Sequence, residues 1–235
     1  LTKAEKNILN SNQLGFLLSK TPKSHIYENT LPSFQKAFQL GANGVEIDVH
    51  CCKTGEVIVF HDLDLKRCFK DSRLIENLTY NELRTLRLEG EFIIPTLNEV
   101  LEIIPKNAYL NIELKGRNTA LPVFELLKAH TALNTNIIIS SFYKQELKSY
   151  RTLDANAKLG VLTNFNFQEA LYFSETINAY SFHPHYSLLN EDSVQLIKQR
   201  GLKIFTWTVN TNSLIKTLSH LQVDAIITDD PLLFN

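Results

Sequence analysis

A regular alternation of short apolar segments and amphipathic segments runs through most of this chain, and no other feature constrains its fold as strongly. The apolar segments have the length and the Val, Ile and Leu content of buried strands, whereas the amphipathic segments repeat apolar residues with helical spacing. Besides the apolar run that holds Glu46 and Asp48, strands are expected at 13–18, 56–60, 109–115, 137–140, 159–162, 179–183, 203–209 and 225–228. Helices are expected at 32–40, 97–104, 121–129, 144–150, 167–173, 191–200 and 213–218. About eight strand–helix units predict an α/β fold, the TIM (β/α)8 barrel.

Length and composition agree with one barrel domain. A chain of 235 residues with 44% hydrophobic content is long enough to bury a sizeable core. We expect a polar lead-in at 1–12, a single barrel at 13–235 and a small polar insertion, 64–95, after the second strand. Within the insertion, the run L-T-Y-N-E-L-R-T-L predicts one capped helix.

Charge and cysteine content exclude several classes of function. The formal net charge is -1 and the charged residues are well mixed, so we expect no nucleic-acid partner. Cys51, Cys52 and Cys68 have no Cys-x-x-Cys spacing, which favours buried free thiols over disulfides or a zinc site. No apolar run reaches membrane-spanning length, and the first residues resemble a polar helix rather than a signal peptide. We therefore expect a cytoplasmic protein without stable membrane insertion, unless a leader has been removed.

Three acidic residues point to a cation site. Glu46 and Asp48 are two residues apart in an apolar strand, so their side chains share one face. Isolated charges are unstable in an apolar core, so this face either meets water at a strand end or holds a cation. Glu113, on the next strand, adds a third carboxylate, and such an oxygen-rich set suits Mg²⁺ or Ca²⁺. The alternative is that these acids pair with Lys and Arg at an exposed rim.

Two neighbouring residues could act beside such a cation. Lys115 follows Glu113 by two residues, so it offers a positive charge to an anion on the same face, or forms an ion pair within the strand. A Thr54-Gly55 turn reverses the chain and brings His61 back towards the acids. Its imidazole exchanges a proton near neutral pH, or serves only as a structural hydrogen-bond donor.

Later strands add candidates for ligand contact. His183 and His185 flank Pro184, which interrupts strand pairing, so rim positions that touch a ligand are favoured over ligands of a transition metal. Trp207, in the run I-F-T-W-T-V-N, either walls a pocket or fills the barrel core.

Several motifs resemble one known family in the order in which they occur. The chain contains E-N-T-L-P-S-F-Q-K-A-F-Q-L-G-A-N-G-V-E-I-D-V, then K-T-G-E-V-I-V-F-H-D, I-P-T-L-N-E-V-L, N-I-E-L-K, F-T-W-T-V-N and V-D-A-I-I-T-D-D-P. From about Gly15 to its end, the chain closely resembles the bacterial glycerophosphodiester phosphodiesterase family. The resemblance implies a TIM-barrel enzyme of lipid metabolism that uses one divalent cation to hydrolyse glycerophosphodiesters to glycerol 3-phosphate and an alcohol.

The resemblance also implies roles for individual residues. The metal ligands of the family match Glu46, Asp48 and Glu113. The second catalytic histidine matches His61, and a lysine next to the phosphate matches Lys115. The motif glutamate of E-N-T, which supports the family's site, matches Glu28, and Lys20 stands where the family has an arginine that clamps the phosphate. Together with the residues singled out above, the residues expected to contact the substrate or its phosphate are Lys20, His183 and Trp207.

One motif departs from the family pattern. The family's His-Arg-Gly run, counted back from Glu28, is replaced here by Ser19-Lys20-Thr21. Lysine still offers a charge to phosphate, but serine cannot exchange a proton near neutral pH. Losing one general acid or base lowers a rate by roughly a hundredfold to ten-thousandfold. His25 lies in the same loop as a substitute, or is an ordinary surface histidine.

Three functions therefore compete. The first is a metal-dependent glycerophosphodiester phosphodiesterase, slowed by the loss of the first histidine. The second is a catalytically inactive family member that binds a phosphodiester or phosphate ligand. The third is a changed substrate, as in related barrels of the sphingomyelinase D type, although the weakly charged surface offers no membrane-docking signal.

Overall fold

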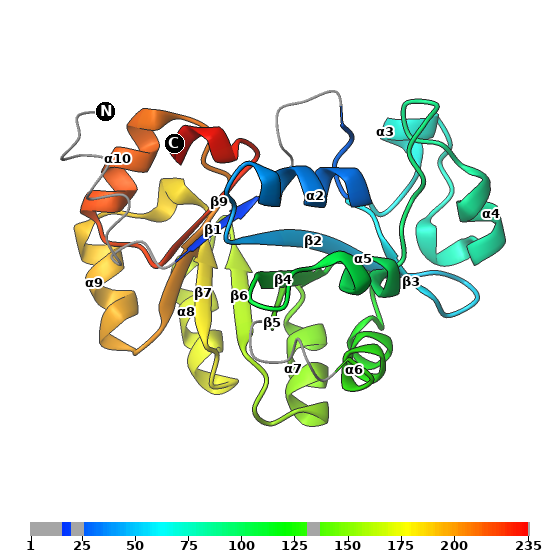
Figure 1. Cartoon of the computed structure of the whole chain (residues 1–235). Coiled ribbons are helices and arrows are strands. Elements are labelled where there is room, and N and C mark those ends of the chain that lie inside the picture. Colours follow the sequence, from blue (N-terminus) through cyan, green and yellow to red (C-terminus); the bar gives the residue numbers. More distant parts are fainter. Residues whose placement is uncertain (1–15, 20–25, 131–136, 235) are drawn as a thin grey trace.

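The computed structural model describes residues 16–19, 26–130 and 137–234. In these residues, nine strands form one curled sheet in the order β1-β9-β8-β7-β6-β5-β4-β2-β3, and pairing of β1 with β2 closes it into a barrel (Figure 1). The strands are β1 (Phe16–Ser19), β2 (Gly44–Cys51), β3 (Val57–Val59), β4 (Tyr109–Leu114), β5 (Ile137–Ser141), β6 (Leu159–Thr163), β7 (Ser181–Pro184), β8 (Lys203–Thr206) and β9 (Ala225–Thr228). Only β3 is antiparallel, as the hairpin partner of β2. The predicted TIM barrel is confirmed.

Helices cover the outside of the barrel. They are α2 (Leu31–Gln39), α5 (Leu97–Ile103), α6 (Ala120–Lys128), α7 (Lys144–Leu153), α8 (Phe167–Thr176), α9 (Glu191–Gln199) and α10 (Asn212–His220). Thr96 shows why one of them begins where it does: its hydroxyl accepts a hydrogen bond from the backbone of Glu99, whose carboxylate binds the Thr96 N–H in return. Among the described helices, none has the length and apolarity needed to cross a membrane.

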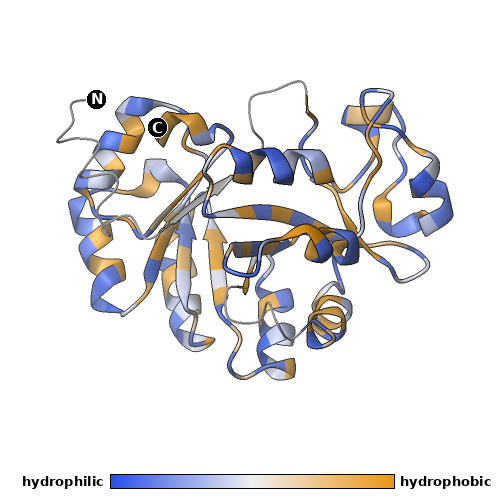
Figure 2. Ribbon diagram, in the orientation of Figure 1, coloured by the Kyte–Doolittle hydropathy of each residue, from blue (hydrophilic) through white to orange (hydrophobic). Residues whose placement is uncertain are grey.

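Alternation along the central strand separates the core from the site. Val45, Ile47 and Val49 of β2 are fully buried in the layer between sheet and helices. Glu46 and Asp48 therefore face the barrel interior, because successive side chains point to opposite faces of a strand. Figure 2 shows the resulting change between apolar and polar residues along β2.

The insertion after β3, expected to be polar, has a buried apolar core of its own. It contains α3 (Lys66–Phe69), a 3-10 turn η1 (Ile75–Asn77) and α4 (Tyr80–Thr85), which project from one side of the barrel (Figure 1). Its apolar side chains form a small second core with Cys52, Ile58 and Phe60 of the hairpin. The fully buried members of this core include Ile58, Leu65, Ile75, Leu83 and Ile94. These residues are scattered singly along the chain, so no periodic pattern revealed them.

Two further expectations need correction. β8 ends at Thr206 and does not continue to residue 209, since Thr206 is its last residue paired with β9. The three cysteines are free, but only Cys52 is buried, whereas Cys51 and Cys68 are partly exposed. Cys51 is the last residue of β2, and Cys68 lies in the insertion, where the Tyr27 hydroxyl approaches its sulfur at 2.8 Å.

A buried carboxylate from α7 caps the N-terminus of α6. The backbone N–H groups of Asn118, Thr119 and Ala120 donate to the Glu146 carboxylate at 2.7, 3.1 and 3.0 Å. We expect Glu146→Ala to lower the free energy of unfolding by about 2–4 kcal/mol, because three backbone N–H groups at the start of α6, two of them in buried residues, lose their acceptor. Urea unfolding measures the change. Glu125→Ala, an exposed position on α6, is the control and is expected to shift stability by less than about 0.5 kcal/mol.

Candidate active site

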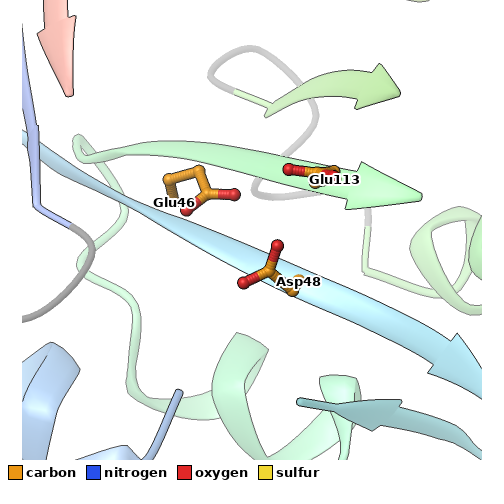
Figure 3. A group of neighbouring side chains, drawn as sticks. All are labelled: Glu46, Asp48 and Glu113. Carbon is orange, nitrogen blue, oxygen red and sulfur yellow. The ribbon is translucent and has the colours of Figure 1, made fainter. Parts of the chain in front are cut away.

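Three carboxylates meet inside the barrel near the carboxyl ends of two neighbouring strands. Glu46, Asp48 and Glu113 are each at most 5% exposed, and one oxygen of each lies within 4.8 Å of the other two (Figure 3). The parallel register of β2 and β4 explains the meeting, because Asp48 and Glu113 are direct partners in it. Among the described residues, this is the one group of acidic, histidine or cysteine side chains close enough together to hold a metal ion.

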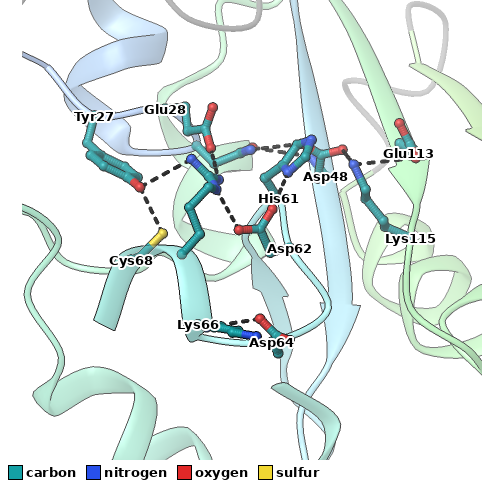
Figure 4. Close-up of polar contacts among 12 residues, drawn as sticks. Tyr27, Glu28, Asp48, His61, Asp62, Asp64, Lys66, Cys68, Glu113 and Lys115 are labelled. Atoms are coloured by element: carbon teal, nitrogen blue, oxygen red, sulfur yellow. Dashed lines mark hydrogen bonds and ion pairs between the residues drawn. The ribbon is translucent and has the colours of Figure 1, made fainter. Parts of the chain in front are cut away.

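Asp48 is fixed from two sides. Its Oδ1 accepts a hydrogen bond from Lys115 Nζ at 3.1 Å, and the same ammonium lies 3.9 Å from Glu113 Oε1 (Figure 4). Its Oδ2 accepts from Asn29 Nδ2 at 2.9 Å, and its own N–H donates to Asn29 Oδ1 at 3.2 Å. Lys115 therefore contacts both acids, and Asn29 orients one of them. Sequence reasoning assigned no role to Asn29, although the E-N-T motif contains it.

A hydrogen-bonded chain holds His61 in place. His61 Nδ1 lies 2.6 Å from Asp62 Oδ1, and Arg67 Nε donates to Asp62 Oδ2 at 2.6 Å. Arg67 also forms an ion pair with Glu28 (Figure 4). Burial acts to raise the pKa of Asp62, but the hydrogen bonds from Arg67 and His61 outweigh it and lower the pKa. Asp62 thus stays ionised at neutral pH and holds His61 by its Nδ1, leaving Nε2 as the nitrogen that can exchange a proton with a ligand.

Most of the predicted site residues line one cavity of about 260 Å³; they are Glu28, Glu46, His61, Glu113, Lys115 and Trp207. Trp207 forms part of the wall, with its Nε1–H bonded to the backbone oxygen of His183 at 2.9 Å. Asn111 and Phe142 also line the cavity and were not predicted. Volume alone does not identify the site, since a larger hollow of about 1000 Å³ between α9 and α10 contains none of these residues.

His183 does not lie at the rim, where the sequence placed it. Its side chain is fully buried, its ring stacks on Phe205 with 4.8 Å between centroids, and its Nε2 lies 2.7 Å from Ser181 Oγ. A Cβ at Gly160 would lie 2.4 Å from Nε2, so only glycine fits beside the ring. His185 instead lies near the surface with Nδ1 bonded to Ser187 Oγ. β7 continues through His183 to Pro184, and Phe182 packs in the layer between sheet and helices. Because successive side chains of a strand alternate, His183 points into the barrel.

The remaining predicted residues are near the first strand. Lys20 and His25 lie outside the described residues, as does Thr21. The backbone of Ser19 is described: it ends β1 and is in register with Val45 of β2 and Thr228 of β9. The Ser19-Lys20-Thr21 run therefore begins at the carboxyl end of a barrel strand, where TIM barrels carry their active sites.

Burial of His183 predicts a dependence of stability on pH. Burial lowers the pKa of His183 from 6.5 to about 3. Between these values the unfolded chain binds a proton that the folded chain does not, so the free energy of unfolding falls as pH falls, by at most about 1.4 kcal/mol per pH unit. Urea unfolding between pH 7 and pH 4 should show a shallower fall for His183→Gln than for the unmodified chain. Parallel curves would contradict the assignment.

Comparisons with known proteins place this geometry in a family context. Residues 19–233 match the model of the glycerophosphoryl diester phosphodiesterase family. A glycerophosphodiester phosphodiesterase of Caldanaerobacter subterraneus subsp. tengcongensis is 34% identical over 220 residues, which cover 88% of this chain and 90% of the relative. One from Bacillus altitudinis is 31% identical over 224 residues, which cover 89% of this chain and 91% of the relative.

Solved structures superpose on most of this chain. An Oleispira antarctica phosphodiesterase, solved in complex with the product sn-glycerol-3-phosphate, superposes with a TM-score of 0.85 at 29% identity and covers 93% of this chain and 94% of its own. A protein from Galdieria sulphuraria shares the fold, with a TM-score of 0.83 at 23% identity over 93% of this chain and 94% of its own.

Proposed function

Because this chain belongs to the glycerophosphoryl diester phosphodiesterase family, a family of phosphodiester hydrolases, we propose that it hydrolyses glycerophosphodiesters to glycerol 3-phosphate and an alcohol with one divalent cation, Mg²⁺ or Ca²⁺. The observation that carries the proposal is the buried cluster of three carboxylates formed by Glu46, Asp48 and Glu113. Relatives named for this activity support it, as does the phosphodiesterase that was solved with sn-glycerol-3-phosphate.

The three carboxylates fit a hard cation. They offer only oxygen ligands, they come from two rigid strands, and they are buried, so their mutual repulsion is weakly screened. Lys115 offsets part of this negative charge but not all of it. When bound, the cation would supply positive charge that neutralises the phosphate of the substrate. Glu46, Asp48 and Glu113 would hold it.

Other residues of the chain have the remaining roles in binding and proton transfer. Lys115, with its ammonium between two acids, binds the phosphate and keeps Asp48 in position. His61 gives or takes a proton through Nε2, since Asp62 occupies Nδ1. Glu28 supports this pair through Arg67. Trp207 walls the substrate cavity, and Lys20 adds a charge for the phosphate in place of the family's arginine.

The test is hydrolysis of glycerophosphocholine and glycerophosphoethanolamine by protein treated with EDTA and then supplied with Mg²⁺ or Ca²⁺. We expect release of glycerol 3-phosphate only after a cation is added. Turnover that persists in EDTA would refute the role of the cation.

A second candidate function rests on the serine at position 19. If the protein binds phosphodiesters without cleaving them, the triple change Ser19→His, Lys20→Arg and Thr21→Gly should create activity while cation affinity stays constant. Cleavage by the unmodified chain would exclude this inactive candidate.

A further inference from the structure

Large apolar side chains are exposed beside the candidate active site. Leu63 is 50% exposed, Phe142 and Tyr143 are each 40% exposed, and Phe165 is 65% exposed. Leu63 follows the hairpin, Phe142 and Tyr143 follow β5, and Phe165 follows β6. All four line a second cavity of about 470 Å³, which we call the apolar cavity.

The apolar cavity is continuous with the one that holds the acids. Glu113, Lys115, Phe142 and Leu162 line both. If Lys115 holds the phosphate of a substrate, the group attached to that phosphate would therefore lie over Phe142. Because the two cavities are continuous, the geometry favours part of the substrate itself as the occupant of the apolar cavity.

The charges around the apolar cavity are balanced and do not favour a charged occupant. Glu169 forms an ion pair with Lys144, and Glu113 belongs to the acidic cluster. The ammonium groups of Lys144 and Lys148 lie 5.5 and 5.8 Å from the ring centroid of Phe173, which also lines the cavity. The cavity is lined by two lysines, Lys115 and Lys144, and two glutamates, Glu113 and Glu169, so its lining has no net charge to attract an ammonium group, whereas a hydrocarbon chain would meet apolar walls.

We propose that the apolar cavity binds a hydrocarbon chain carried by the substrate next to its phosphate, so that the preferred substrates are amphiphilic phosphodiesters. The inference rests on the proposed function. Each methylene group that leaves water favours binding by up to roughly fourfold, so a chain of eight carbons that is only partly buried gains at least about tenfold. The chain is attached to the glycerol or to the leaving alcohol.

The first experiment compares three substrates below their micelle concentrations. Glycerophosphoethanolamine has no chain, its mono-octanoyl ester carries one on the glycerol, and the octyl ester of glycerol 3-phosphate carries one on the leaving alcohol. We expect kcat/KM to rise at least about tenfold for one chain-bearing substrate, which identifies the attachment point. Equal values for all three would overturn the proposal, while failure to cleave any of them would instead reject the proposed function.

Binding tests the cavity independently of hydrolysis. Calorimetry should show that octyl phosphate binds at least about tenfold more tightly than methyl phosphate. Equal affinities would overturn the proposal. Sedimentation of the protein with phosphatidylcholine vesicles, without any preference for octyl phosphate, would overturn it in favour of a membrane contact.

Matched variants locate the effect. Phe165→Ser should remove most of the preference for the chain, about fivefold or more, and leave glycerophosphoethanolamine cleavage unchanged. Tyr172→Ser is the control, because Tyr172 is an aromatic residue of α8 that is 68% exposed and does not line the apolar cavity. Equal behaviour of the two variants would show that Phe165 does not contact the chain.

Discussion

Glu113→Gln is expected to abolish cation-dependent hydrolysis, with a loss of at least about a thousandfold in kcat/KM. The substitution keeps the size of the side chain and removes one negative charge from the group formed with Glu46 and Asp48. A neutral amide oxygen is a weaker ligand for a hard cation, so cation affinity should fall by roughly a hundredfold as well. Calorimetric titration with Ca²⁺ and Mg²⁺ measures the affinity, and release of glycerol 3-phosphate measures the rate.

The control for this prediction is Glu125→Gln, which removes a charge from the exposed face of α6. It should change neither the rate nor the affinity. If Glu113→Gln loses activity but binds cations as before, Glu113 acts on the substrate and not on the cation. Loss of the folded state would show in the circular dichroism spectrum and would exclude both interpretations.

His61→Ala is expected to reduce kcat by roughly a hundredfold to ten-thousandfold, while cation affinity stays unchanged. In the proposed mechanism the imidazole transfers the proton, whereas the acidic cluster is built from β2 and β4 and does not include His61. Asp62→Asn should give a smaller loss, because the imidazole remains but its Nδ1 contact at 2.6 Å no longer involves a charged partner. Steady-state kinetics at several pH values distinguish the two variants.

His220→Ala, at an exposed position at the end of α10, is the matched histidine control and should leave kcat unchanged. An undiminished rate in His61→Ala would remove His61 from the mechanism. Activity that His61→Ala regains on addition of free imidazole would support proton transfer as its role.

Local patterns predicted the elements well. The helix expected at 97–104 spans Leu97–Ile103, and the strand expected at 109–115 spans Tyr109–Leu114. Both are defined by short-range signals, namely a Thr-x-x-Glu capping box for the helix and a β-branched, apolar run for the strand. The second core of the insertion has no such signal, because its members are far apart in the chain and meet only after folding.

Local sequence patterns also failed to identify residues that act through long-range contacts. Asn29 is separated by 19 positions from Asp48, which it orients, and Glu146 caps a helix that begins 26 positions earlier. For His183 the error was the opposite one, because a local signal was given too much weight. The proline beside it suggested a break in the strand, yet the strand continues and the ring is buried in the barrel.

The sequence by itself determined the barrel and the presence of Glu46 and Asp48 on one face of a buried strand, because both follow from the period of side chains along one element. The sequence also predicted Glu113 as a third acid and Lys115 beside it, but only the tertiary structure decided that oxygens of the three acids lie within 4.8 Å of one another, that Lys115 also contacts Asp48, and that Asp62 and Arg67 hold His61. These contacts depend on the register between β2 and β4 and on the path of the insertion, which no local pattern encodes.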